Sequence, residues 1–162
     1  MTALRDALSQ DQRDLIEALL GKGPVPGGFT GAELLPARES LLLKRRRGVA
    51  KAWPALAASL GVRFGPAFAA YATQHPGTPN GGSAADGWGF AKHLEAERVL
   101  KGAARLELAA FELAHRVGPR GLSHRRFAVK VVARPGRGYA GIGVHIRGLG
   151  TRWLFLGTRD RN

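Results

Sequence analysis

Apolar residues recur with two different periods along the chain, and the period changes near residue 120. Before that point they return every three or four positions, as on one face of an α-helix. Such stretches lie at 3–20, 37–60, 64–75, 88–94 and 98–117. Farther along, over 125–135, 141–148 and 151–157, they alternate with polar residues or glycine, as in half-buried strands. The pattern predicts an α+β fold, a mainly helical body followed by a small three-stranded antiparallel β-meander.

Glycine and proline divide the chain further. Residues 21–28 and 75–87 are rich in both, which predicts loops, and Gly118 with Pro119 ends the last helical stretch. Thr30 could cap a short turn over 31–35, and Pro54 would kink the long helix or restart it. We therefore expect a helical domain over 1–117 and a basic β-meander over 118–162, packed on that domain or appended to it.

The composition excludes several classes of protein. The 162 residues include no cysteine, so disulfides, thiolate metal sites and cysteine nucleophiles are absent. The first residues contain no apolar run of signal-peptide length, and no 18-residue apolar stretch follows. We expect a cytoplasmic protein that is not inserted in a membrane.

The charge is high and unevenly distributed. The formal net charge is +13, and residues 117–162 carry ten Lys or Arg residues against a single acid, Asp160. Such a field favours an anionic partner, which could be nucleic acid, an anionic membrane surface or an acidic protein or peptide. Charge alone does not distinguish these partners, and it could also serve only solubility.

Four consecutive cations, residues 44–47, stand inside the long helical stretch. Helical projection places Lys44 and Arg47 opposite the apolar stripe, whereas Arg46 projects close to it. That stripe contains Leu42, Val49, Trp53, Leu56 and Leu60. Most of the run is therefore interpreted as the solvated face of a helix, and Arg46 as a semi-buried or snorkelling side chain.

No motif indicates an active site. The stretch "GRGYAG" (136–141) matches a dinucleotide-binding pattern by letters, but a strand follows it, so a hairpin loop is predicted. The five histidines lack metal-binding spacing, and Glu107 and Glu112, five residues apart on a helix, do not share a face. We expect no catalytic residue, no metal and no cofactor.

The predicted meander offers a candidate binding surface. Lys130 and Arg134 lie on the opposite face of their strand from Phe127, as do His145 and Arg147 relative to Ile142. Antiparallel pairing would join the two polar sets on one exposed face and turn the apolar sets toward the helices. The predicted partner- or peptide-binding residues are Lys130, Arg134, His145, Arg147 and Arg152.

A series of spaced residues in the helical part resembles a known family. Arg38 is followed by Trp53-Pro54, Leu60-Gly61, spaced aromatics and Pro76, and later by Gly87, Phe90 and Leu106-Glu107. This order over roughly residues 3–116 resembles the N-terminal module of HvfC/MbnC-like partner proteins, once labelled a putative DNA-binding domain. This chain departs from the family with Glu39-Ser40 in place of an Asn pair, Trp53 in place of Phe, and a shortened C-terminal region.

The resemblance implies a non-catalytic adaptor. Such a subunit docks on a multinuclear-iron TIM-barrel enzyme and helps present a ribosomally made peptide to it, as in the biosynthesis of modified peptides. In this hypothesis an outer strand of the meander accepts the peptide by strand addition. The alternatives are a charge-driven nucleic-acid-binding protein and a purely structural helical domain.

Overall fold

The structure is a computed structural model that describes residues 2–76, 80–134 and 139–157, without the side chains of 2–4, 133–134, 139 and 156–157. The helices are α1 (Thr2–Leu19), α2 (Gly31–Ala52), α3 (Pro54–Leu60), a 3₁₀ turn (Gly61–Arg63), α4 (Phe64–Gln74), α5 (Gly82–Ala96) and α6 (Gly102–Ala114). The strands are β1 (His115–Gly118), β2 (Gly121–His124), β3 (Phe127–Arg134), β4 (Tyr139–Ile146) and β5 (Gly150–Gly157). The α+β prediction is confirmed.

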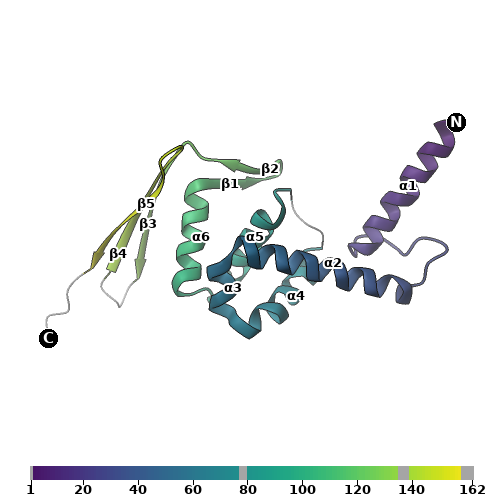
Figure 1. Ribbon diagram of the computed structural model, residues 1–162, viewed down its shortest axis with the longest axis horizontal. Helices are drawn as coiled ribbons and strands as arrows, with labels where there is room; N and C mark the ends of the chain where they lie inside the picture. The colour runs from purple at the N-terminus through teal and green to yellow at the C-terminus, as the bar shows by residue number, and fades with distance from the viewer. Residues whose placement is uncertain (1, 77–79, 135–138, 158–162) are drawn as a thin grey trace.

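The elements follow one another along an elongated molecule. Helix α1 lies at one end, helices α2 to α5 form the middle, and α6 separates them from the sheet at the other end (Figure 1). Strands β3, β4 and β5 form an antiparallel sheet in that order, and β1 pairs with β2 in a separate hairpin. None of the helices within the described residues is both long and apolar enough to cross a bilayer.

Local signals in the sequence explain how the helices begin. The Thr30 side chain accepts a hydrogen bond from the Glu33 amide while Glu33 reaches back to the Thr30 amide, which is a capping box at the start of α2. The predicted turn over 31–35 is thus the first part of α2. Pro54 occupies the first turn of α3, where its missing N–H costs nothing, so the chain restarts there as a new helix.

Trp53 lies at the centre of the helical core. Its side chain is buried, its Nε1 donates a hydrogen bond to the Ala84 carbonyl at 3.0 Å, and its ring lies 4.8 Å from that of Phe111. A Cβ on Gly87 would stand 2.1 Å from the indole, so only glycine fits at that position in α5. The core also contains Val49, Leu56, Leu60, Phe64, Phe68, Tyr71, Phe90, Leu94 and Leu108.

Several predicted boundaries were wrong, including the start of the long helix, which is at residue 31 and not 37. Residues 82–87 begin α5 rather than continuing a loop, and the part of the predicted loop at 77–79 lies outside the described residues. Helix α6 covers 102–114 rather than 98–117, because Arg98 adopts a left-handed conformation (φ 61°) before it. The chain then forms the hairpin β1–β2, in which Gly118 faces Gly121 across the turn that the sequence indicated only as a helix stop.

Candidate functional site

The outward face of the β3–β4–β5 sheet is the reverse of the predicted one. The register pairs Val129 with Val144 and Lys130 with Gly143, so the apolar and polar sets do separate onto two faces as expected. The apolar face, however, is the one in solvent. Its members Phe127, Val129, Val131, Ile146 and Leu154 are each at least 41% exposed.

Glycines on β4 explain this reversal. A Cβ on Gly143 would lie 2.5 Å from a Leu113 methyl and 2.8 Å from the Trp153 ring. Because Gly143 carries no side chain, α6 and the Trp153 ring can approach the middle of the sheet closely. The face that contains Gly143, Lys130, His145 and Trp153 therefore packs toward α6, and the β-branched face does not.

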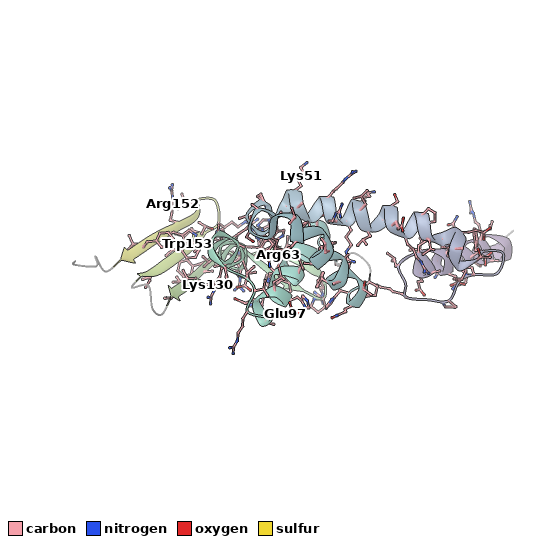
Figure 2. The ribbon with its side chains drawn as sticks, turned by 90° about the horizontal axis from the view of Figure 1, so that it is seen from below. Lys51, Arg63, Glu97, Lys130, Arg152 and Trp153 are labelled. Carbon is pink, nitrogen blue, oxygen red and sulfur yellow. The ribbon has the colours of Figure 1, made fainter. Side chains whose placement is uncertain are left out.

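The five predicted site residues consequently fall into separate environments. Lys130 is half-buried against α6, and His145 is buried with its Nδ1 2.9 Å from the Thr151 hydroxyl. Arg147 and Arg152 are exposed, and Arg152 extends away from the sheet (Figure 2). The Arg134 side chain lies outside the described part. The expectation of one exposed basic face was wrong, because the face of Lys130 and His145 packs on α6, whereas Arg152 is on the opposite face beside Val144.

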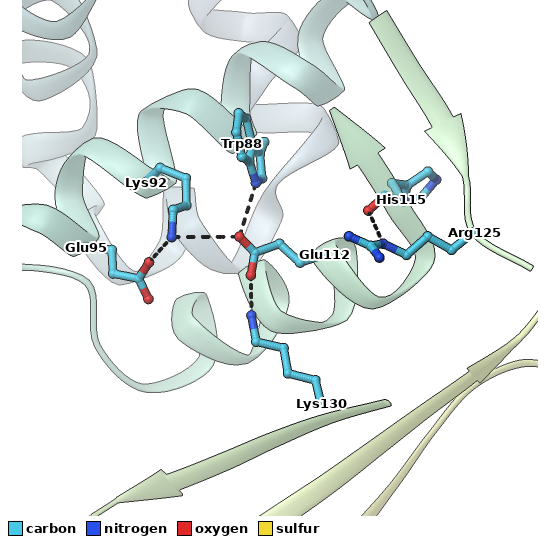
Figure 3. Close-up of polar contacts among 7 residues, drawn as sticks. All are labelled: Trp88, Lys92, Glu95, Glu112, His115, Arg125 and Lys130. Atoms are coloured by element: carbon cyan, nitrogen blue, oxygen red, sulfur yellow. Dashed lines mark hydrogen bonds and ion pairs between the residues drawn. The ribbon is translucent and has the colours of Figure 1, made fainter. Parts of the chain in front are cut away.

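Glu112 of α6 gathers a polar cluster between α5, α6 and β3 (Figure 3). It accepts a hydrogen bond from Trp88 Nε1 at 3.3 Å, forms an ion pair with Lys130, and lies 3.8 Å from Lys92 Nζ, which also pairs with Glu95. Burial on its own raises the pKa of Glu112, but the hydrogen bond and charge of Lys130, with Trp88 and Lys92, outweigh it and lower that pKa. The carboxylate is held ionised and connects the sheet to two helices, an arrangement suited to a structural tie rather than to proton transfer.

A cleft of about 370 Å³ opens beside this cluster. Its lining includes Lys130 and Glu112 together with Arg116, Arg125 and His115. The Arg125 guanidinium is partly engaged, because its Nε donates a hydrogen bond to the His115 carbonyl at 3.1 Å. Three of the charged side chains that line the cleft are cations and one is an acid, and no three His, Asp or Glu residues among the described ranges are placed to hold a metal ion.

Two histidines, His115 and His124, lie together just after the C-terminal end of α6. His115 and His124 are cross-strand partners with ring centroids 4.5 Å apart. Burial lowers the pKa of His115, and the charges of His124 and His145 lower it further. His115 therefore stays neutral to lower pH in the folded chain than in the unfolded chain.

This shift predicts a loss of stability in acid. Since the folded-state pKa of His115 lies below the ordinary value of 6.5, unfolding takes up a proton just below pH 6.5, and the stability present above that pH is lost as the pH falls. The variant His115→Phe should show a smaller drop in melting temperature between pH 7.5 and pH 5.5 than the wild type, with His75→Gln as control. Equal drops in the wild type and His115→Phe would contradict the role of His115.

The four consecutive cations, residues 44–47, differ in how exposed they are and in what they contact. Lys44 and Arg47 are exposed, which agrees with a solvated helix face, and Arg46 is semi-buried with a guanidinium nitrogen beside Gly65. Sequence reasoning missed Arg45. Its Nε and Nη2 donate to the two oxygens of the fully buried Asp86 at 2.6 and 2.8 Å. The one available signal was an isolated acid, Asp86, just before an apolar helical run.

A groove of about 710 Å³, lined in part by Arg45, lies where α1 approaches α2, α4 and α5. Its wall combines leucines, among them Leu41 and Leu42, with the cations Arg38 and Lys44. Arg38 holds α1 in place, because its Nη2 donates to the Ala18 carbonyl at 2.7 Å. The groove is therefore both apolar and basic, like the sheet at the opposite end of the molecule.

One family and one relative match this chain. A model of the SCO6045-like C-terminal domain matches residues 9–96, more than half of the chain, so this protein belongs to that family. A UPF0276 protein from Streptomyces avermitilis (strain ATCC 31267) is 40% identical over 90 residues, which are 56% of this chain but 18% of that protein. No solved structure matches.

The two matches cover only part of this chain and of its relative. The family match covers most of α1 and all of α2 to α5, and it ends before α6 and the sheet. The Streptomyces protein is several times longer than the matched segment. Neither match names the HvfC/MbnC-like proteins, so a relation to that family stays a prediction.

Proposed function

We propose that this chain is a non-catalytic partner subunit that docks on a multinuclear-iron TIM-barrel enzyme and helps present a ribosomally made peptide to it. The observation that carries the proposal is the match to 18% of a longer UPF0276 protein. In that relative a segment like this one is covalently joined to a much larger remainder. A segment that is fused to a larger body in one protein is well suited to bind such a body as a separate chain in another.

The surface of the chain supports a protein or peptide partner. The C-terminal region combines a net charge of +9 with exposed apolar side chains, and interfaces use this combination when the partner is acidic. Strands β3 and β5 are the outer strands of the sheet, so each has one side without a strand neighbour in its sheet. Such an edge suits strand addition by an extended peptide.

The proposal predicts which cations matter. The double variant Arg147→Glu/Arg152→Glu should weaken binding to the enzyme more than Lys44→Glu/Arg47→Glu, since all four side chains are exposed but only the first pair belongs to the sheet region. Lys130 is unsuitable for this comparison, because a carboxylate there would face Glu112 and disturb the tie to α6. Each exposed charge contributes little alone, about 1 kcal/mol or less, so double variants are compared.

Binding is measured by titrating each double variant against a purified multinuclear-iron TIM-barrel enzyme of the proposed partner class, at two salt concentrations. A larger loss from the helix pair, with duplex DNA binding lost in parallel, would replace this proposal with the nucleic-acid alternative. For that alternative the structure offers charge but a poor stacking platform. Trp153 is partly buried against Gly143 and stacks on Phe155, with ring centroids 5.9 Å apart.

A further inference from the structure

The sheet leaves one complete apolar face without a covering element. The face comprises Phe127, Val129 and Val131 of β3, Ile142, Val144 and Ile146 of β4 and Leu154 of β5, with Val129 beside Val144 and Ile142 beside Leu154. Helix α6 covers the other side, and no described element lies against this one (Figure 1). Contiguous exposed apolar surface of this kind marks interaction sites in proteins that are otherwise well packed.

One cation, Arg152, is on the apolar face. Arg152 is paired with Val144 in the register and is therefore on the same face as Leu154, two residues farther along β5. Its side chain is exposed (Figure 2). Arg126 and Arg147, linked by a backbone hydrogen bond of 2.9 Å, are exposed at the end of the sheet where Phe127 begins β3. The surface is thus an apolar patch with arginines within it and at its border.

Charge and area distinguish the possible occupants. Two copies of this chain would each bring +13, and a face-to-face pairing would place both sets of arginines close together. Three eight-residue strands span only about 26 by 14 Å, or roughly 400 Å², while a stable interface needs about 800 Å² from each partner. The occupant must therefore extend past the sheet edge and supply acidic groups to the arginines.

We propose that this outer face is the surface by which the chain docks on the enzyme named in the proposed function, on which this inference rests. The enzyme would contribute an apolar patch bordered by Asp or Glu side chains. The apolar side chains of the sheet would supply the buried area, and Arg152 would pair with an enzyme carboxylate. The peptide-binding edge of the sheet remains available, because docking uses the face and strand addition uses the edge.

The test compares two pairs of exposed valines. Val129→Thr/Val131→Thr removes apolar surface from the outer face while keeping β-branched shape and strand propensity. The matched control Val62→Thr/Val99→Thr changes two valines exposed elsewhere, in the 3₁₀ turn and before α6. Circular dichroism verifies that both variants fold. Titration with the purified enzyme should show about tenfold weaker binding for the first pair and little change for the second.

The outcomes separate this inference from the function on which it rests. If the wild type binds the enzyme and both pairs bind equally well, the docking face is refuted and the adaptor function survives. If the wild type fails to bind the enzyme, both are refuted. Sedimentation of the free chain adds one more outcome, because a wild-type dimer that the Val129→Thr/Val131→Thr pair dissociates would assign the face to a second copy and overturn the proposal.

Discussion

Replacing Trp53 with alanine is expected to lower the free energy of unfolding by about 3–5 kcal/mol. The indole is fully enclosed between α2, α5 and α6, and its removal leaves a cavity lined by Gly87 and Phe111 that the backbone cannot easily close. It also leaves the Ala84 carbonyl, in a part-buried site, without the hydrogen bond that Nε1 donates.

Chemical denaturation measures this loss directly. The control is Val62→Ala, at a position 95% exposed, which should change stability by less than about 0.5 kcal/mol. Trp53→Phe should fall between the two, because it retains the ring but not the N–H. An unchanged denaturation midpoint in Trp53→Ala would show that Trp53 is not a core residue and that α2 is rotated relative to the structure.

Breaking the ion pair between Arg45 and Asp86 is also expected to lower the free energy of unfolding strongly. Asp86→Asn keeps the shape of the side chain but leaves the Arg45 guanidinium in a site where only 11% of its side chain is exposed. An uncompensated buried charge costs about 3–5 kcal/mol. The guanidinium also lies 5.5 Å from the centre of the Phe68 ring, so its displacement would disturb the aromatic core.

A double-mutant cycle measures the interaction energy between Arg45 and Asp86 apart from the effect of each single substitution. Replacing both residues with leucine removes the charge and its partner together, and such replacements are often close to neutral. We therefore expect Arg45→Leu/Asp86→Leu to be more stable than either single variant, as read from thermal unfolding. Additive losses would mean that the two side chains do not interact.

The sequence predicted the helical body well because periodicity and capping are local properties. Thr30 and Pro54 each act on the backbone within a few residues, so the cap at Thr30 and a kink or restart at Pro54 could be inferred without knowledge of the fold, although the long helix was expected from 37 and α2 begins at Gly31. The switch from period 3.6 to period 2 likewise placed the three-stranded sheet correctly. The hairpin β1–β2 was missed because its eight strand residues include few apolar side chains.

Long-range pairing could not be inferred in the same way. Arg45 and Asp86 are 41 residues apart, and nothing local to either indicates the other. The facing of the sheet was predicted wrongly because β-branched side chains were assigned to the buried side by hydrophobicity alone. The decisive residue was Gly143, whose missing side chain lets α6 approach the opposite face.

Gly143 also determines which residues of the sheet are available for binding. With one face of the sheet closed by α6, Lys130 became part of a structural tie and the exposed apolar residues became the available surface. A basic region with exposed apolar strands is better suited to an acidic protein than to a phosphate backbone, which charge alone would satisfy. An anionic partner stays a prediction, while the residues proposed to bind it change.

The most direct test of the adaptor function is a titration of the wild-type chain with a purified multinuclear-iron TIM-barrel enzyme and, separately, with random duplex DNA, at 50 and 200 mM salt. We expect a stoichiometric complex with the enzyme that persists at the higher salt, because apolar burial contributes to it. DNA should bind weakly at both concentrations. No complex with the enzyme, together with DNA affinity that falls by about 10³–10⁵ between the two salt concentrations, would refute the adaptor function and identify a nucleic-acid-binding protein.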